Sequence, residues 1–249
     1  RLTDFTIDNK MIISCTKGIN ENPFMTMSEA IEKHFNNSSI KVGVLSGPNL
    51  AKEIADEKVA GTVIASKHAD LCHQAREILS SSTFKIYTSD DIKGIELAGA
   101  LKNIYAIISG YCHSLDVGEN AIGLILTRSM AEMSNFAVNK GANPITFLGL
   151  AGMGDLVATC FSKLSRNYQF GWAIGEGLDI EAAKYKVGQV AEGLNTIRII
   201  HNEISSSKIK MPLVSGMHEI LFNSGSKELL LEQIINSDIY VDVDFDVES

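Results

Sequence analysis

The chain has 249 residues, 45% of them hydrophobic and 21% charged, which is ordinary for one large globular domain or two smaller ones. Its net charge of −8 argues against a nucleic-acid partner or an anionic membrane surface. No apolar run is long enough to span a membrane, and four widely spaced cysteines without a CxxC pair favour reduced thiols in a cytoplasmic protein.

Short β-rich runs alternate with helical patterns in the first part of the chain. The predicted strands cover residues 11–16, 41–46, 61–66 and 84–89, and the predicted helices cover residues 27–35, 50–58 and 69–79. Apolar, β-branched strands that alternate with helices are typical of a parallel sheet covered on both faces. This pattern predicts an α/β domain of the dinucleotide-binding type up to about residue 90.

Strand signals stop after about residue 91, and helical periodicity dominates the rest of the chain. The predicted helical segments are 120–140, 153–176, 191–205, 211–222 and 226–236. We therefore expect three parts: residues 1–90 from a nucleotide-binding domain, a helical substrate and catalytic domain over 91–236, and an acidic tail over 237–249. The tail alternates acidic and apolar residues, which fits an edge strand or a frayed end, and we favour the frayed end.

The glycine-rich turn of a dinucleotide-binding domain is not found in the sequence. Such a domain opens with a strand, a GxGxxG turn and a helix whose N-terminus holds the pyrophosphate. Gly149, Gly152 and Gly154 stand between helical segments and do not follow a predicted strand. We therefore expect the chain to begin inside its own nucleotide domain, so that the segment alone is inactive.

Lys102 stands out because its surroundings in the sequence, ELAGALKNIYAI from Glu96, are otherwise apolar or small. A lysine is rarely buried without a partner or a task. Most of its neighbours one helical turn away are small, which leaves room for a ligand beside the ammonium group. The alternative is a lysine that extends to the surface from an amphipathic helix.

Six short motifs, taken together, resemble the NAD(P)-dependent glycerol-3-phosphate dehydrogenases, in particular the bacterial type. They are Lys17-Gly18, Gly47-Pro48-Asn49, Ala100 to Asn103, the G-x-x-D-L-x-x-T-C run around Met153 to Cys160, Arg166-Asn167, and Val190 to Gly193. The resemblance implies a Rossmann-type parallel sheet, here incomplete at its N-terminal side, followed by an all-α domain. The missing glycine-rich turn is the departure from the family pattern.

The reaction that this resemblance implies is hydride transfer between dihydroxyacetone phosphate and sn-glycerol 3-phosphate, with NAD or NADP, feeding glycerophospholipid synthesis. It implies that Lys102 is the proton donor to the ketone oxygen and that Lys17 adds a second positive charge. Asp155 would orient the lysine, and Thr159 would add a hydrogen bond from the same helical face. The partner is a small phosphorylated substrate, and a homodimer is a fold-level expectation.

The remaining expected site residues bind the substrate or the cofactor. Arg166 suits the phosphate because its planar guanidinium group binds such oxygens through two hydrogen bonds. The expected substrate-binding set is Lys17, Gly47, Asn49, Asn103, Asp155, Thr159, Ser165, Arg166 and Asn167. The expected cofactor-binding set is Lys17, Ala51, Arg166, Val190 and Glu192.

Taken singly, several of these residues have simpler interpretations. Asp155 alone is more often a helix N-cap, the Ser165-Arg166-Asn167 run alone would be a solvated turn, and Gly47-Pro48 is a turn signal in any protein. The six histidines form no i,i+4 pair on a helix, so the sequence assigns no metal. Two other functions stay open: a related hydroxyacid- or phosphogluconate-type dehydrogenase, and a non-catalytic binding or oligomerisation module.

Overall fold

A computed structural model describes residues 8–35, 39–188, 191–207, 209–226 and 228–236 of the chain. Contacts divide the chain into two compact units. Unit 1 comprises residues 1–99 and 141–155, and unit 2 comprises residues 100–140 and 156–249. The predicted acidic tail lies outside the described residues. Among the described residues, none of the helices combines the length and the apolar run that a bilayer crossing needs.

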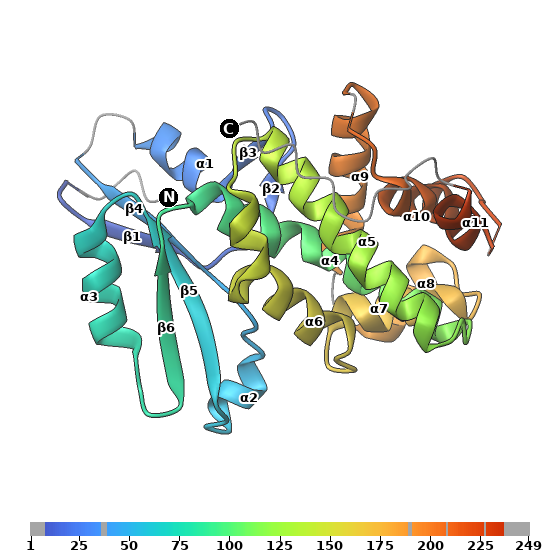
Figure 1. The fold of residues 1–249 in the computed structure, drawn as a ribbon, viewed down its shortest axis with the longest axis horizontal. Coiled ribbons are helices and arrows are strands. Elements are labelled where there is room, and N and C mark those ends of the chain that lie inside the picture. The colour runs from blue at the N-terminus through green and yellow to red at the C-terminus, as the bar shows by residue number, and fades with distance from the viewer. Residues whose placement is uncertain (1–7, 36–38, 189–190, 208, 227, 237–249) are drawn as a thin grey trace. The chain divides into compact units, whose positions relative to one another are not determined.

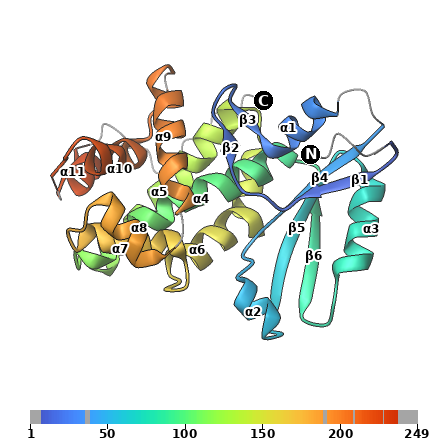
Figure 2. The same cartoon turned by 180° about the vertical axis from the view of Figure 1, so that it is seen from behind.

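Unit 1 contains a four-stranded sheet in the order β1-β4-β5-β6 (Figures 1 and 2). Its strands are β1 (Met11–Ser14), β4 (Lys41–Ser46), β5 (Ala60–Ser66) and β6 (Phe84–Ser89). The β1–β4 and β5–β6 pairs are parallel, and the β4–β5 pair is antiparallel. The mostly parallel sheet confirms the predicted fold class, but the antiparallel pair differs from the sequence-based expectation.

The antiparallel pair follows from the short segment between β4 and β5. The predicted helix over residues 50–58 is only one and a half turns long in the structure, α2 (Ala51–Ala55), and none of its residues is buried. A parallel return requires a connection that crosses over a face of the sheet, usually as a packed helix. Because α2 buries nothing, the connection makes no such crossover and β5 returns antiparallel to β4.

Both faces of the sheet are covered within unit 1, as the sequence predicts. On one face, α3 (Ala69–Leu79) packs Leu71 against Ile64 and Ile86. On the other face, Val63 and Ala65 pack with residues of the α4 start and of the 141–155 segment, which include Ile95 and Ala151. Neighbouring residues of β5 thus point to opposite faces, as the two-residue repeat of a strand requires.

A small hairpin and a helix precede β4 in unit 1. The hairpin consists of β2 (Ile19–Asn20) and β3 (Met25–Thr26), and α1 (Met27–His34) follows directly. The Glu29 carboxylate accepts the Thr26 N–H at 2.8 Å, which satisfies a backbone donor at the start of α1. The sequence predicts α1 but not the two short strands.

Unit 2 is helical throughout its described secondary structure. It takes in most of α4 (Ile92–Ser114) and of α6 (Asp155–Cys160), which begin in unit 1, and the whole of α5 (Glu119–Asn139), α7 (Arg166–Gly175), α8 (Ile180–Val187), α9 (Glu192–Ser205), α10 (Pro212–Phe222) and α11 (Leu229–Ile235). The predicted helix over 153–176 is therefore two helices, and α8 lies outside every predicted segment. Two further short turns belong to unit 1. They are a 3₁₀ turn, η1 (Pro144–Leu148), and a π turn, η2 (Leu150–Gly154).

The α4 helix is the core of unit 2, with Leu101, Ile104 and Ile108 fully buried. A helix that is apolar on all sides is expected to be buried on all sides. Gly171 of α7 has no Cβ atom, and this lets α7 approach α4 closely. A Cβ atom at this position would lie 1.9 Å from the Ile107 carbonyl oxygen. Backbone of α7 therefore packs directly against backbone of α4.

Candidate active site

In unit 1, a lysine and a buried carboxylate form an ion pair near the carboxyl ends of two strands. Lys17 follows the end of β1 by three residues, and its Nζ lies 2.7 Å from Asp155 Oδ2 and 3.3 Å from the Gly47 carbonyl oxygen. The Asp155 side chain is 1% exposed and that of Lys17 is 22% exposed. Because a buried carboxylate is costly without a cation, Lys17 stabilises Asp155 while keeping part of its own surface accessible.

The π turn η2 places Asp155 at the first position of α6. This turn packs closely against η1, since a Cβ on Gly152 would lie 2.3 Å from the Phe147 carbonyl oxygen. Single π turns are rare, and they are frequent at functional sites. From the sequence we predicted that the glycines at 149, 152 and 154 form a turn and the start of a helix. The structure confirms this prediction.

The Gly47-Pro48-Asn49 turn lies at the carboxyl end of β4, packed against β5. A Cβ on Gly47 would lie 3.1 Å from Thr62 Cα, so only glycine fits there without displacing β5. Asn49 Nδ2 donates to Thr62 Oγ1 at 2.9 Å, and Thr62 Oγ1 donates to the Ser46 carbonyl oxygen at 3.0 Å. These bonds fix the turn on the sheet.

Two buried polar atoms of this turn have no hydrogen-bond partner among the described residues: Ser46 Oγ and Asn49 Oδ1. Buried polar atoms are nearly always hydrogen-bonded in folded proteins, so these two atoms are candidates for contact with a ligand. The carboxyl ends of strands are also where open α/β sheets bind nucleotides. These atoms therefore fit a contact with part of a bound nicotinamide cofactor at this edge of the sheet. Ser46 does not belong to the residues that the sequence predicted to bind substrate or cofactor. The only feature of the sequence that could have indicated it is its position at the end of a predicted strand.

In unit 2, Lys102 is buried, with 7% of its surface exposed. Its Nζ donates to Thr159 Oγ1 at 2.8 Å. The alternative interpretation of Lys102 as a lysine extending to the surface is therefore wrong. The hydroxyl group of Thr159, also 7% exposed, gives the ammonium group a fixed direction.

Asn103, Ser165 and Asn167 are also buried, and each makes a contact within unit 2. Asn167 Oδ1 accepts the Gly193 N–H at 3.0 Å, and Asn103 Nδ2 lies 3.5 Å from Glu192 Oε2. Ser165 is the N-cap of α7, where its Oγ accepts the Tyr168 N–H at 3.3 Å. A solvated turn is thus the wrong interpretation for the serine and for this asparagine.

Three predicted residues are exposed: Arg166 at the first position of α7, Glu192 at the first position of α9, and Ala51 at the first position of α2. Val190 lies outside the described residues. Within unit 1 the structure brings together Lys17, Gly47 and Asp155, with Asn49 on the same turn as Gly47. Within unit 2 it brings together Lys102 with Thr159, and Asn103 with Glu192.

A mostly parallel sheet with polar groups at its strand ends, followed by a helical unit that buries a lysine, is the architecture of a dinucleotide-dependent dehydrogenase. Comparison with protein families makes the assignment specific. Residues 1–72 match the family described as NAD-dependent glycerol-3-phosphate dehydrogenase N-terminus, and residues 91–232 match its C-terminus. The chain belongs to the NAD-dependent glycerol-3-phosphate dehydrogenase family.

Individual relatives agree with this assignment. Proteins called glycerol-3-phosphate dehydrogenase (NAD(P)+) from Pseudomonas syringae pv. tomato and Pseudomonas putida are each 47% identical, over 239 and 236 residues. The matches cover 96% and 95% of this chain, and 70% and 69% of those proteins.

Solved structures of the family have the same fold. The glycerol-3-phosphate dehydrogenase of Coxiella burnetii matches with a TM-score of 0.86 and 33% identity, covering 91% of this chain and 69% of that one. The enzyme of Saccharomyces cerevisiae matches with a TM-score of 0.78 and 26% identity, covering 89% and 67%.

Proposed function

We propose that this protein interconverts sn-glycerol 3-phosphate and dihydroxyacetone phosphate by hydride transfer with NAD or NADP. The observation that carries the proposal is the buried Lys102, whose ammonium group is held by a hydroxyl group in a chain of this family. The nicotinamide cofactor supplies the hydride or accepts it. A cytoplasmic enzyme that feeds glycerophospholipid synthesis, acting as a homodimer, is part of the same proposal.

Lys102 is the proposed acid and base. As hydride reaches the ketone carbon, negative charge develops on the ketone oxygen, and a proton donor beside that oxygen lowers the barrier. Thr159 Oγ1 accepts an N–H of the Lys102 ammonium group, which holds this group in a fixed direction towards the substrate. In the oxidising direction the neutral amine of Lys102 accepts the proton of the substrate hydroxyl group.

Lys17 and Asp155 are proposed to prepare the site for the developing charge. The Lys17 ammonium group is anchored by Asp155 Oδ2 and the Gly47 carbonyl oxygen, so two of its three donors are taken. Among the described residues nothing further accepts from this group, so its third donor is proposed to serve the substrate oxygen or the cofactor. Asp155 acts as a positioning residue, because its carboxylate fixes where the Lys17 charge lies.

The phosphate group is proposed to bind at the start of α7. The exposed Arg166 guanidinium group suits a phosphate because its planar donors match two phosphate oxygens at once. Asn167 uses its carbonyl oxygen on Gly193, so its Nδ2 amide remains a donor, and the Ser165 hydroxyl proton is a further donor. The N-terminal end of a helix adds a favourable field for an anion.

The cofactor is proposed to lie along the Gly47-Pro48-Asn49 turn. Asn49 Oδ1 and Ser46 Oγ are the atoms there that lack a partner among the described residues. Ala51, Arg166, Val190 and Glu192 complete the proposed cofactor contacts, and Gly47, Asn49 and Asn103 the proposed substrate contacts.

Steady-state kinetics of the full-length protein test this function. Dihydroxyacetone phosphate with NADH or NADPH should be reduced with normal Michaelis–Menten saturation, and unphosphorylated dihydroxyacetone should be a far poorer substrate. Faster turnover of a 2-keto acid or of 6-phosphogluconate would favour one of the related dehydrogenases instead. Absence of turnover with every substrate, together with tight cofactor binding, would favour a binding module.

A further inference from the structure

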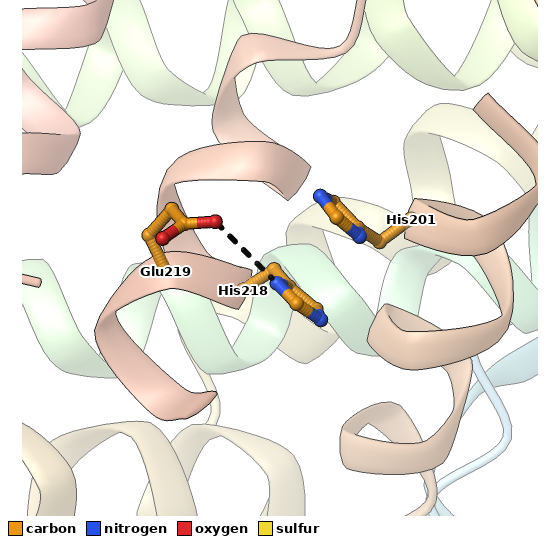
Figure 3. A group of neighbouring side chains, drawn as sticks. All are labelled: His201, His218 and Glu219. Atoms are coloured by element: carbon orange, nitrogen blue, oxygen red, sulfur yellow. Dashed lines mark ion pairs between the residues drawn. The ribbon is translucent and has the colours of Figure 1, made fainter. Parts of the chain in front are cut away.

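Two histidines of unit 2, far apart in the sequence, stack on each other. His201 of α9 and His218 of α10 have ring centroids 3.7 Å apart and an angle of 6° between the ring planes. Glu219 follows His218, and its Oε1 lies 3.8 Å from His218 Nδ1. Figure 3 shows the two parallel rings with the Glu219 carboxylate beside them. One donor atom from each residue lies within 4.8 Å of the other two.

His218 Nδ1 is buried and has no hydrogen-bond partner among the described residues. The 3.8 Å separation from Glu219 is too long for a hydrogen bond, and only 14% of the His218 side chain is exposed. The Phe222 ring packs against His218 with centroids 4.9 Å apart, which limits the freedom of the imidazole ring. A buried ring nitrogen without a partner requires an explanation, and a ligand beside it provides one.

The carboxylate of Glu219 is held in place by a neighbour. Asn223 Nδ2 lies 3.0 Å from both Glu219 oxygens, so the amide orients the carboxylate. In metal sites, groups that hydrogen-bond to the ligands fix their direction in the same way. The Glu219 side chain is 39% exposed, which provides a path from solvent.

Burial and neighbouring charged groups act on the His218 imidazole. Burial lowers the pKa of His218, the neighbouring His201 and Arg198 lower it further, and Glu219 opposes them. The Arg198 guanidinium group lies over the Phe222 ring, 5.1 Å from its centroid.

We propose that His201, His218 and Glu219 form a binding site for a divalent transition-metal ion, with Zn²⁺ as the best match. Two imidazole nitrogens and one carboxylate oxygen are a donor set that Zn²⁺ uses, with water at the fourth position. Donors about 2.1 Å from one ion lie roughly 3.4 Å apart. Because the nitrogen lone pair lies in the plane of each ring, loading brings the donor atoms closer by about 1 Å and tilts the two rings out of their parallel stack. Arg198 opposes a cation, so we expect weaker binding than the same three donors would give without it.

The ion would join α9 to α10 and stabilise unit 2. None of its three ligands belongs to the residues proposed to bind substrate or cofactor, so the ion has no part in hydride transfer. The sequence gives no sign of this site because 17 positions separate the two histidines and they lie on different helices.

Calorimetric titration with ZnCl₂ alone tests the proposal, on the full-length protein without a histidine tag, stripped with EDTA and free of cofactor. We expect a saturable site for one equivalent of Zn²⁺. His218→Gln and Glu219→Gln should each weaken binding at least tenfold, equivalent to about 1.4 kcal/mol. The matched control is His73→Gln, because His73 forms an exposed pair with Glu77 at 3.5 Å and should leave the affinity unchanged.

Folding of each variant is checked by its thermal melt in EDTA. Glu219→Gln changes a partly exposed side chain, so its melting temperature in EDTA should equal that of the wild type. This variant keeps the test valid if His218→Gln unfolds. Co²⁺ should give a visible absorption spectrum of a four-coordinate site, lost in Glu219→Gln. Binding that is not saturable, or is unchanged in Glu219→Gln and His201→Gln, would overturn the proposal. Because no cofactor or substrate is present, either outcome leaves the proposed dehydrogenase function standing.

Discussion

Lys102 Nζ donates a 2.8 Å hydrogen bond to Thr159 Oγ1, and both residues are 7% exposed. A charged donor and a neutral acceptor that are both buried make a stronger contact than an exposed pair. A buried hydroxyl group 57 positions away in the sequence therefore helps to set the direction of the lysine. Two predictions depend on this relationship.

Lys102→Ala should abolish nearly all turnover of dihydroxyacetone phosphate while the protein stays folded. Lys102→Arg should be almost as inactive, because a guanidinium group does not deprotonate near neutral pH. Kinetics of both variants, with circular dichroism as the folding control, provide the measurement. Turnover within tenfold of the wild type, about 1.4 kcal/mol, would show that Lys102 is not the acid.

Thr159→Val should lower kcat by roughly tenfold to a hundredfold, because a hydrogen bond to a charged group contributes about 1.5–3 kcal/mol. Valine has nearly the shape of threonine and carries a methyl group in place of the hydroxyl group. Since Thr159 acts by positioning Lys102, the basic limb of the pH–rate profile should move as well. Thr159→Ser restores the hydroxyl group and should recover most of kcat and the original profile; equal losses in both variants would exclude the positioning role.

Arg166→Ala should raise KM for dihydroxyacetone phosphate far more than KM for dihydroxyacetone. The guanidinium group is proposed to bind the phosphate, and binding of a non-reacting group positions the reacting one. Arg166→Lys should recover part of the loss, since lysine keeps the charge but not the paired hydrogen bonds. If both substrates lose equally, the arginine acts on the cofactor and not on the phosphate.

Gly171→Ala should lower the free energy of unfolding by about 1–3 kcal/mol, because the added methyl group would lie 1.9 Å from the Ile107 carbonyl oxygen. Gly123→Ala on α5 is the matched control. Nothing lies within 4 Å of a Cβ at Gly123, so alanine should raise stability there by roughly 0.5–1 kcal/mol. Urea denaturation of both variants measures the difference, and a similar change at the two positions would contradict the close packing of α7 on α4.

Glu132→Gln should stabilise the protein at alkaline pH relative to the wild type. Burial raises the pKa of Glu132 from 4.5 to about 8, against hydrogen bonds that lower it, which include those from Leu213 N–H and Tyr105. The folded protein therefore binds more protons than the unfolded chain between these values. Stability from this group is present below pH 4.5 and is lost as pH rises towards 8, at up to about 1.4 kcal/mol per pH unit.

Denaturation midpoints at several pH values between 5 and 8.5, roughly the window of that pKa shift, check this effect. Glutamine keeps an acceptor for the Leu213 N–H, 2.7 Å from Glu132 Oε1, and an amide that can bind Tyr105 Oη. The advantage of the variant should grow with pH. A constant difference across the range would mean that Glu132 does not titrate as its burial indicates.

Local sequence signals were sufficient for some elements and not for others. The predicted bounds of α3 and β6 are those of the structure, because periodicity and flanking residues define them within a few positions. The direction of β5 against β4 was not predictable, since it depends on whether α2 packs on the sheet. Ser165 was predicted to bind the substrate. In the structure it is also the N-cap of α7, because the chain leaves the helical conformation between α6 and α7.

The candidate site shows the same division. Lys17 and Asp155 are 138 positions apart, so only the family motifs, and not spacing, could pair them before the structure did. Ser46 carries no signal beyond its place at a strand end. The stack of His201 on His218 depends on how α9 and α10 pack, which no short-range pattern encodes.

The division of the chain into two units, each made of two segments, has a consequence for experiments that dissect the protein. Residues 141–155 return to unit 1, where Asp91 accepts hydrogen bonds from the Asn143 N–H at 3.0 Å and from Thr146 Oγ1 at 2.6 Å. A single cut after Gly99 would separate that segment, and Asp155 with it, from the rest of unit 1. Independent expression of either unit therefore needs a rejoined chain, with residues 1–99 linked to 141–155 and residues 100–140 linked to 156–249.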